Sequence, residues 1–134
     1  MIATVEAQGV LRTFASKVAE CNVVEQQNAI ELVVRRNGLV ITITVPHEVF
    51  EWFVDVEDRA AGLKAHDWYD YARYESGRAS NFDREMAEDL RSFIENIAER
   101  PLRMIDADPR KSSGVLEWQQ DGTWAAAVPA ALPE

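Results

Sequence analysis

The stretch from His47 to Glu75 holds the residue types best suited to chemistry or to partner binding. Between Glu48 and Glu75 there are eight acidic and three basic side chains, a net charge of −5 within a chain of net charge −9, and all three tyrosines of the chain. Two carboxylates held at a set distance are used by acid–base enzymes, whereas carboxylates mixed with tyrosine and tryptophan form faces that attract basic partners. The stretch therefore supports two kinds of hypothesis, catalysis and binding.

The catalytic alternative depends on His66, which stands beside Asp67 and close to Asp70. It describes a small-molecule-binding domain or a small hydrolase-like enzyme with a pocket between sheet and helices. Against it, the chain has no glycine-rich phosphate loop, no G-x-S-x-G elbow and no cysteine–histidine spacing typical of zinc. His47 has no neighbouring nucleophile to activate. We therefore expect no cofactor and no metal, and favour a protein without catalytic activity.

The binding hypothesis assigns a partner-binding face to this stretch. Tyrosine and tryptophan give rigid contact area with a polar group, and surrounding carboxylates steer a positively charged partner. A structural alternative is that Phe50, Trp52 and Trp68 belong to the core and that the tyrosines cap it. The candidate partner-binding residues are Glu51, Phe53, Asp55, Asp67, Tyr69, Asp70, Tyr71 and Tyr74.

Composition limits the remaining possibilities. With 134 residues and 47% hydrophobic residues, the chain fits one domain, 1–134, with a core of its own. The net charge of −9 disfavours direct nucleic-acid binding and favours a basic protein partner. No apolar run reaches the ~18 residues of a membrane helix, and the N-terminus lacks signal-peptide features, so we expect no membrane association and a cytoplasmic location.

Hydrophobic periodicity predicts the first half of the fold. Apolar residues at steps of three and four predict an amphipathic helix over about residues 4–22, with Cys21 on its buried face. Two β-branched runs around Asn37-Gly38 predict a hairpin of strands 29–36 and 39–45, because this dipeptide accepts the positive φ angles of a type I′ turn. A two-residue turn pairs Arg36 with Leu39, and Ile30 with Val45.

Alternation and capping signals predict the second half. Strands are expected at about 48–57 and 66–74, the latter at the edge of the sheet, followed by a helix over about 81–100 that starts near Ser80 or Asn81, with Asp83 completing the cap of Ser80. One side of this helix is expected to be apolar, with Phe82, Met86, Leu90, Phe93, Ile94 and Ile97. Its acidic residues, Asp89 among them, interleave with arginines and predict an exposed charged face. A C-terminal hairpin is expected at about 115–128 around Asp121-Gly122, although "WAAAV" also fits coil or a helical turn. The predicted fold is α+β: an antiparallel sheet of three to five strands packed against two amphipathic helices in a two-layer sandwich.

This plan, with "VFEWFVDV" followed by "DWYDY" and no catalytic signature, resembles the small acidic immunity proteins that bacteria encode beside toxin domains. The resemblance implies a tight, acidic binding face that neutralises a basic toxin or nuclease, and it carries over no residue roles. A further alternative is a homodimeric structural subunit, joined along an edge strand or the tyrosine-rich surface.

Overall fold

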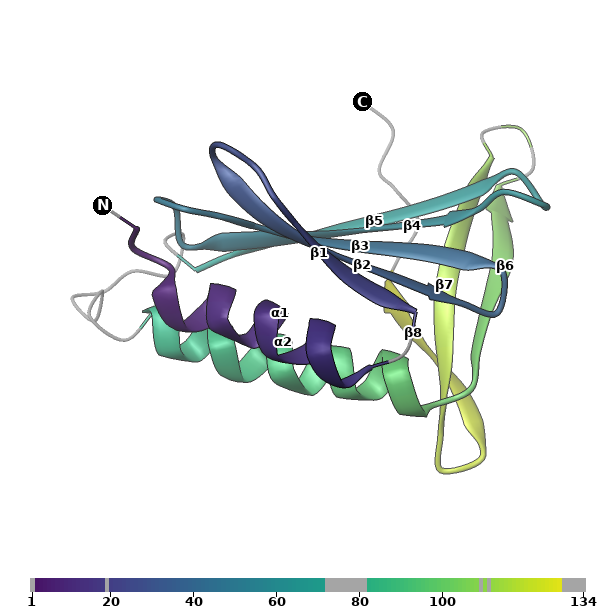
Figure 1. The fold of residues 1–134 in the computed structure, drawn as a ribbon. Coiled ribbons are helices and arrows are strands. Elements are labelled where there is room, and N and C mark those ends of the chain that lie inside the picture. The colour runs from purple at the N-terminus through teal and green to yellow at the C-terminus, as the bar shows by residue number, and fades with distance from the viewer. Residues whose placement is uncertain (1, 19, 72–81, 109, 111, 129–134) are drawn as a thin grey trace.

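The structure, a computed structural model, describes residues 2–18, 20–71, 82–108, 110 and 112–128. It is an α+β fold in which both helices of these residues lie against one face of a mostly antiparallel sheet (Figure 1). In chain order the elements are α1 (Val5–Lys17), β1 (Cys21–Glu25), β2 (Ala29–Arg36), β3 (Leu39–Pro46), β4 (Glu51–Asp58), β5 (Leu63–Asp70), α2 (Phe82–Glu99), β6 (Leu102–Asp108), β7 (Ser113–Gln120) and β8 (Thr123–Val128).

The sheet formed by the described residues has eight strands, so the predicted three to five is too few. The order is β1-β2-β3-β4-β5-β7-β6, and β8 also pairs with β7. Strands β1 and β6 carry weak signals: the predicted first helix overlaps only the first two residues of β1, and β6 has the sequence "LRMIDAD" with little alternation. Parallel pairing at Lys64 and Ser113 joins β5 to β7. The predicted fourth strand is therefore not a simple edge strand.

The β2–β3 hairpin follows the predicted register. Arg36 pairs with Leu39 and Ile30 with Val45, and both turn residues, Asn37 (φ 53°) and Gly38 (φ 76°), have positive φ. The C-terminal hairpin also forms around Asp121-Gly122, but a bulge shifts its far end. The alternating apolar pattern fixed the first register, because a slip of one residue would turn every apolar side chain outward.

The core lies between the sheet and the helices. Alternate residues of β2, β3 and β4 are buried against α1 and α2, so every second side chain of these strands faces the helices. The apolar side of α2 is the predicted one. Its fully or almost fully buried members are Phe82, Met86, Leu90, Phe93, Ile94 and Ile97. The opposite side of the sheet has no described helix over it (Figure 1).

The first helix is shorter than predicted, ending at Lys17 instead of near residue 22. Cys21 opens the edge strand β1 and is only partly buried, so it is not the buried helical cysteine expected from the sequence. Burial nevertheless raises the pKa of its thiol. Strand pairing with β2 outweighs the helical spacing here, since Cys21 pairs with Val34 next to the core.

Asp83 joins the two helices by a contact that the sequence did not suggest. The predicted cap residues Ser80 and Asn81 lie outside the described residues. Asp83, expected to complete that cap, accepts hydrogen bonds from the backbone N–H groups of Glu6 (2.9 Å) and Ala7 (3.0 Å). A carboxylate at these free N–H groups stabilises the N-terminus of α1, where the Thr4 side chain makes no capping bond.

None of the described helices is long and apolar enough to span a membrane.

We predict that Asp83→Ala lowers the free energy of unfolding by about 1–2 kcal/mol, because it leaves two N–H groups of α1 without their acceptor. Urea denaturation followed by circular dichroism measures this change. Glu88→Ala, an exposed acidic position on the same helix, is the control and should change stability by less than about 0.5 kcal/mol. Equal effects of the two variants would refute a capping role for Asp83.

Candidate functional site

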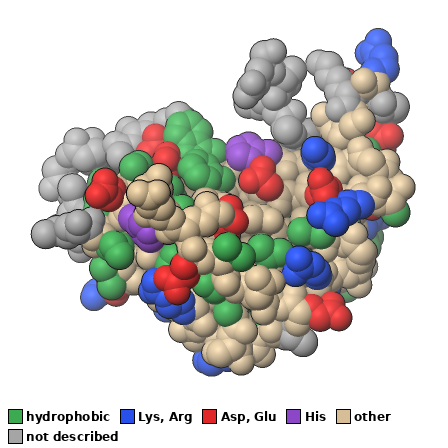
Figure 2. Space-filling model, turned by 45° about the horizontal axis from the view of Figure 1, so that its top comes forward, with side chains coloured by type: hydrophobic (Ala, Val, Ile, Leu, Met, Phe, Trp, Pro, Cys, Tyr) green, Lys and Arg blue, Asp and Glu red, His purple; other side chains and the backbone are tan. Residues whose placement is uncertain are grey.

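Strand alternation divides the candidate residues between the two sides of the sheet. The outward positions of β2 to β5 form a surface that we call the open face; none of them is buried. Figure 2, which turns the upper side of Figure 1 toward the viewer, shows hydrophobic and acidic side chains interspersed there. The open face comprises Glu31, Val33, Arg35, Val40, Thr42, Thr44, Glu51, Phe53, Asp55, Glu57, Lys64, His66, Trp68 and Asp70.

Trp68 gives the open face its largest exposed apolar group. It pairs with Phe53 across β4 and β5, and its side chain is 43% exposed. Its indole Nε1 donates a hydrogen bond to Glu51 Oε2 (2.8 Å), which fixes the ring beside a carboxylate. The alternative that Trp68 is a core residue is therefore wrong. An aromatic ring held in place and exposed is the kind of group that anchors protein–protein contacts.

His66 pairs with Asp55, and not with either partner expected from sequence. Its Nδ1 lies 2.7 Å from Asp55 Oδ1, and the two residues face each other across β4 and β5. Asp67 points to the other side of the sheet because it is the next residue in the strand. The pair borders a hollow of about 380 Å³ on the open face, whose lining also includes Thr42, Glu57 and Lys64.

Tyr69 and Tyr71, with Asp67, lie on the helix side. Tyr71 donates a hydrogen bond to Asp89 Oδ2 of α2 (2.5 Å) and accepts one from Trp52 Nε1 (3.1 Å). Burial raises the pKa of both tyrosines well above its usual range, and hydrogen bonds to Asp67 from Tyr69 and to Asp89 from Tyr71 raise it further. The tyrosines therefore do not share a surface with Glu51, Phe53, Asp55 and Asp70, and Tyr74 lies outside the described residues.

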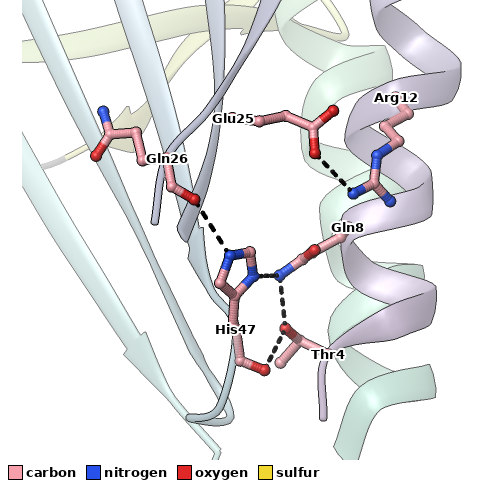
Figure 3. A network of polar contacts seen from close by, with 6 residues as sticks. All are labelled: Thr4, Gln8, Arg12, Glu25, Gln26 and His47. Carbon is pink, nitrogen blue, oxygen red and sulfur yellow. Dashed lines mark hydrogen bonds and ion pairs between the residues drawn. The ribbon is translucent and has the colours of Figure 1, made fainter. Parts of the chain in front are cut away.

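His47 belongs to a separate polar network at the start of α1 (Figure 3). Gln8 Nε2 lies 2.7 Å from His47 Nδ1 and 3.2 Å from Thr4 Oγ1, while His47 Nε2 lies 3.3 Å from the Gln26 carbonyl. With the Gln8 amide donating to Nδ1, the ring donates from Nε2. Thr4 Oγ1 donates to the Pro46 carbonyl (2.5 Å). Nδ1 contacts the Gln8 side chain of α1, and Nε2 contacts the Gln26 backbone carbonyl. His47 directly follows β3, so these contacts link α1 to the end of that strand.

Among the described residues, no hydrogen bond joins either histidine ring to a hydroxyl or thiol side chain. The open-face pair His66–Asp55 could orient a ligand or move a proton, but Thr42 is the nearby hydroxyl that lines its hollow and no contact joins it to the ring. Within the part of the chain that the structure describes, no three histidine, cysteine or carboxylate side chains are grouped in a way that could hold a metal ion.

Comparisons with models of known protein families, with curated proteins and with solved structures find no significant match to this chain.

Two important residues were missed by sequence reasoning. Trp68 and Asp70 are two residues apart and therefore point to the same side of β5. The polar residue at this alternate position was the signal that could have placed Trp68 outward. Asp89 was read as one member of a charged helix face, although it accepts the Tyr71 hydrogen bond from the sheet. Nothing local in the sequence could have predicted that contact, because it depends on how α2 crosses the sheet.

We predict that stability falls as pH rises above about 10, the ordinary tyrosine pKa. Tyr69 and Tyr71 keep their protons in the folded state when an unfolded chain has begun to lose them, so the unfolded state binds fewer protons and unfolding becomes easier. The stabilisation is fully present below pH ~10 and is lost above it. Urea midpoints measured at several pH values from ~8 to ~11 test this.

Tyr71→Phe is the diagnostic variant. Its stability is lower at every pH because Trp52 and Asp89 lose their partner, but its decline above pH ~10 should be shallower than that of the wild type. An unchanged slope would mean that Tyr71 does not retain its proton.

Proposed function

We propose that this protein is a non-enzymatic binding module that recognises a basic protein partner through the open face of its sheet. The observation that carries the proposal is Trp68, an exposed ring set beside Phe53 and hydrogen-bonded to Glu51, on a sheet face without a described covering helix. An apolar centre surrounded by charged groups is the usual anatomy of a protein–protein interface.

Charge supports a basic partner. Five acidic side chains occupy the open face against two basic ones, Arg35 and Lys64. Part of the acidic charge is already paired, since Glu57 binds Arg59 (2.5 Å) and lies 4.0 Å from Lys64, whereas Asp55 is 61% exposed beside His66. The excess negative charge around the Trp68 ring speeds encounter with a positively charged surface and disfavours an acidic one.

The finer proposal is an immunity-type inhibitor that neutralises a basic toxin or nuclease. The support for it is the resemblance of the chain to small acidic immunity proteins, together with the acidic open face. In this proposal the tyrosines on the helix side take no direct part, and the contact residues are Glu51, Phe53, Asp55, Trp68 and Asp70. The partner would lie across β4 and β5.

The test compares two variants of equal charge. The first, Glu51→Gln/Asp55→Asn/Asp70→Asn, removes three carboxylates from the open face. The second, Glu85→Gln/Glu88→Gln/Glu95→Gln, removes three exposed ones from α2 and is the matched control. Wild type and both variants serve as baits in extracts of the host at low and moderate salt, and the recovered proteins are compared by mass spectrometry.

We expect a stoichiometric basic protein with the wild type and the α2 variant, but not with the open-face variant. With the purified partner, the open-face variant should associate about ten-fold or more slowly at low salt, with a flatter salt dependence. A partner that binds both variants alike would refute the assignment of the open face.

A second candidate function is supported by the hollow beside His66 and Asp55. Its volume of about 380 Å³ is at the lower end of the ~300–1,000 Å³ typical of small-molecule sites, and it lies on the open face, not between sheet and helices as the sequence-based hypothesis expected. A thermal-shift screen of metabolites tests it, because a ligand specific for the folded state raises the melting temperature. A hit that His66→Ala abolishes would favour this function over protein binding.

A homodimer joined through the open face is a further proposal, beside the edge-strand and tyrosine-surface dimers expected from the sequence. Light scattering at dilute protein concentration distinguishes it, since a dimer joined through the open face should dissociate in Trp68→Ser and not in the α2 variant.

A further inference from the structure

A pocket lined by aromatic rings lies on the helix side of the sheet, away from the open face. Its volume is about 250 Å³, and it is formed where β4, β5 and β7 meet α2. Trp52 and Phe93 are 2% and 7% exposed and form its floor, while partly buried rings of Tyr69, Tyr71 and Trp118 form its walls. Seven of its eight lining residues belong to β4, β5, β7 or α2, and the eighth, Tyr71, directly follows β5.

The rings meet at angles that make a concave surface. Phe93 is tilted by 57° to Trp52 and by 51° to Trp118, with centroids 5.4 and 5.7 Å apart. Tyr69 stacks on Trp52 with the ring centroids 4.2 Å apart and the planes 19° apart, which holds the two rings together at the side of the pocket. Only the faces of aromatic rings are electron-rich, and a cation within ~6 Å of a ring face is attracted by the quadrupole of the ring.

A carboxylate stands at the rim of this pocket. Asp89 is exposed and is held by the Tyr71 hydroxyl, which is itself held by Trp52. Among the described residues, no lysine or arginine pairs with Asp89 or lies over the rings of the pocket; the described cation–π contact joins Arg103 to Trp124 elsewhere. The site thus combines aromatic faces with an anion that has no described cationic partner.

We propose that this pocket binds a small organic cation, an alkylated ammonium headgroup, with the aromatic rings around the alkyl groups and Asp89 beside the charge. Tyr71 acts as a positioning residue for the Asp89 carboxylate. The volume lies below the ~300–1,000 Å³ of pockets for drug-sized ligands, so it selects a compact headgroup. An alkylated ammonium suits the site because it loses little hydration on entering an aromatic pocket.

This inference does not depend on the proposed function. The pocket and the open face lie on opposite sides of the sheet, and Asp89 and Trp118 are absent from the open face. The ammonium headgroup can come from a free metabolite or from a methylated lysine side chain. Two probes separate these sources: choline, and trimethyllysine with blocked ends.

The experiment titrates each probe into the full chain by calorimetry and by two-dimensional NMR of the indole N–H groups. We expect binding with shifts at Trp52 and Trp118 that exceed those at Trp68 and Trp124. The neutral isostere of choline, 3,3-dimethylbutan-1-ol, should bind about ten-fold or more weakly, because it lacks the charge that the rings and the carboxylate recognise. This comparison needs no variant and so does not depend on folding of a mutant.

Matched variants locate the charge. Asp89→Asn keeps an oxygen that can accept from Tyr71 and should weaken choline about three-fold or more, a moderate effect because the group is exposed. Glu88→Gln removes the same charge one residue away and should change affinity less than about two-fold.

Tighter binding of trimethyllysine than of choline would assign the source to a protein side chain, and the reverse to a metabolite.

The proposal is overturned by any of three results: no binding of either probe at tens of millimolar, equal binding of the neutral isostere, or indole shifts confined to Trp68 and Trp124.

Discussion

The whole surface chemistry of this protein depends on one-sided burial of its sheet. Both described helices pack on the same face of the sheet. Successive residues of a strand therefore point alternately to the core side and to the open face. Trp68 and Tyr69 are adjacent in sequence, yet one is exposed on the open face and the other stacks on Trp52 below the sheet. A run of acidic and aromatic residues that looks like one site is thereby divided into two surfaces.

Sequence reasoning predicted the parts of the fold in which local pattern and tertiary environment agree. The β2–β3 hairpin and the buried side of α2 are examples, because turn chemistry, alternation and helical spacing each point to one arrangement. It failed where a long-range contact decides the outcome. Cys21 leaves the helical pattern to pair with Val34, and Asp83 of α2 caps the N-terminus of α1.

The candidate site shows the same limit. The acidic and aromatic character of the His47–Glu75 stretch could be predicted from composition. Its division between the two sides of the sheet could not, because that requires knowing which residues of β5 point outward. The predicted strand began at His66, three residues late, and a core position for Trp68 stayed open as an alternative. The partners of the ring hydroxyls and of His66 come from other strands or from α2, so no spacing rule along one segment could identify them.

The open face and the pocket beside Asp89 share no side chain, but both are affected by the net charge of the molecule. The net charge of −9 gives the molecule a negative field that attracts cations to either side of the sheet, and at ~0.15 M salt this field decays over ~8 Å. Attraction alone therefore cannot distinguish a basic protein from a small ammonium ion. Shape does so, because the open face offers a partly exposed Trp68 on a broad sheet surface for a protein contact, whereas the pocket beside Asp89 offers a small hollow lined by aromatic rings.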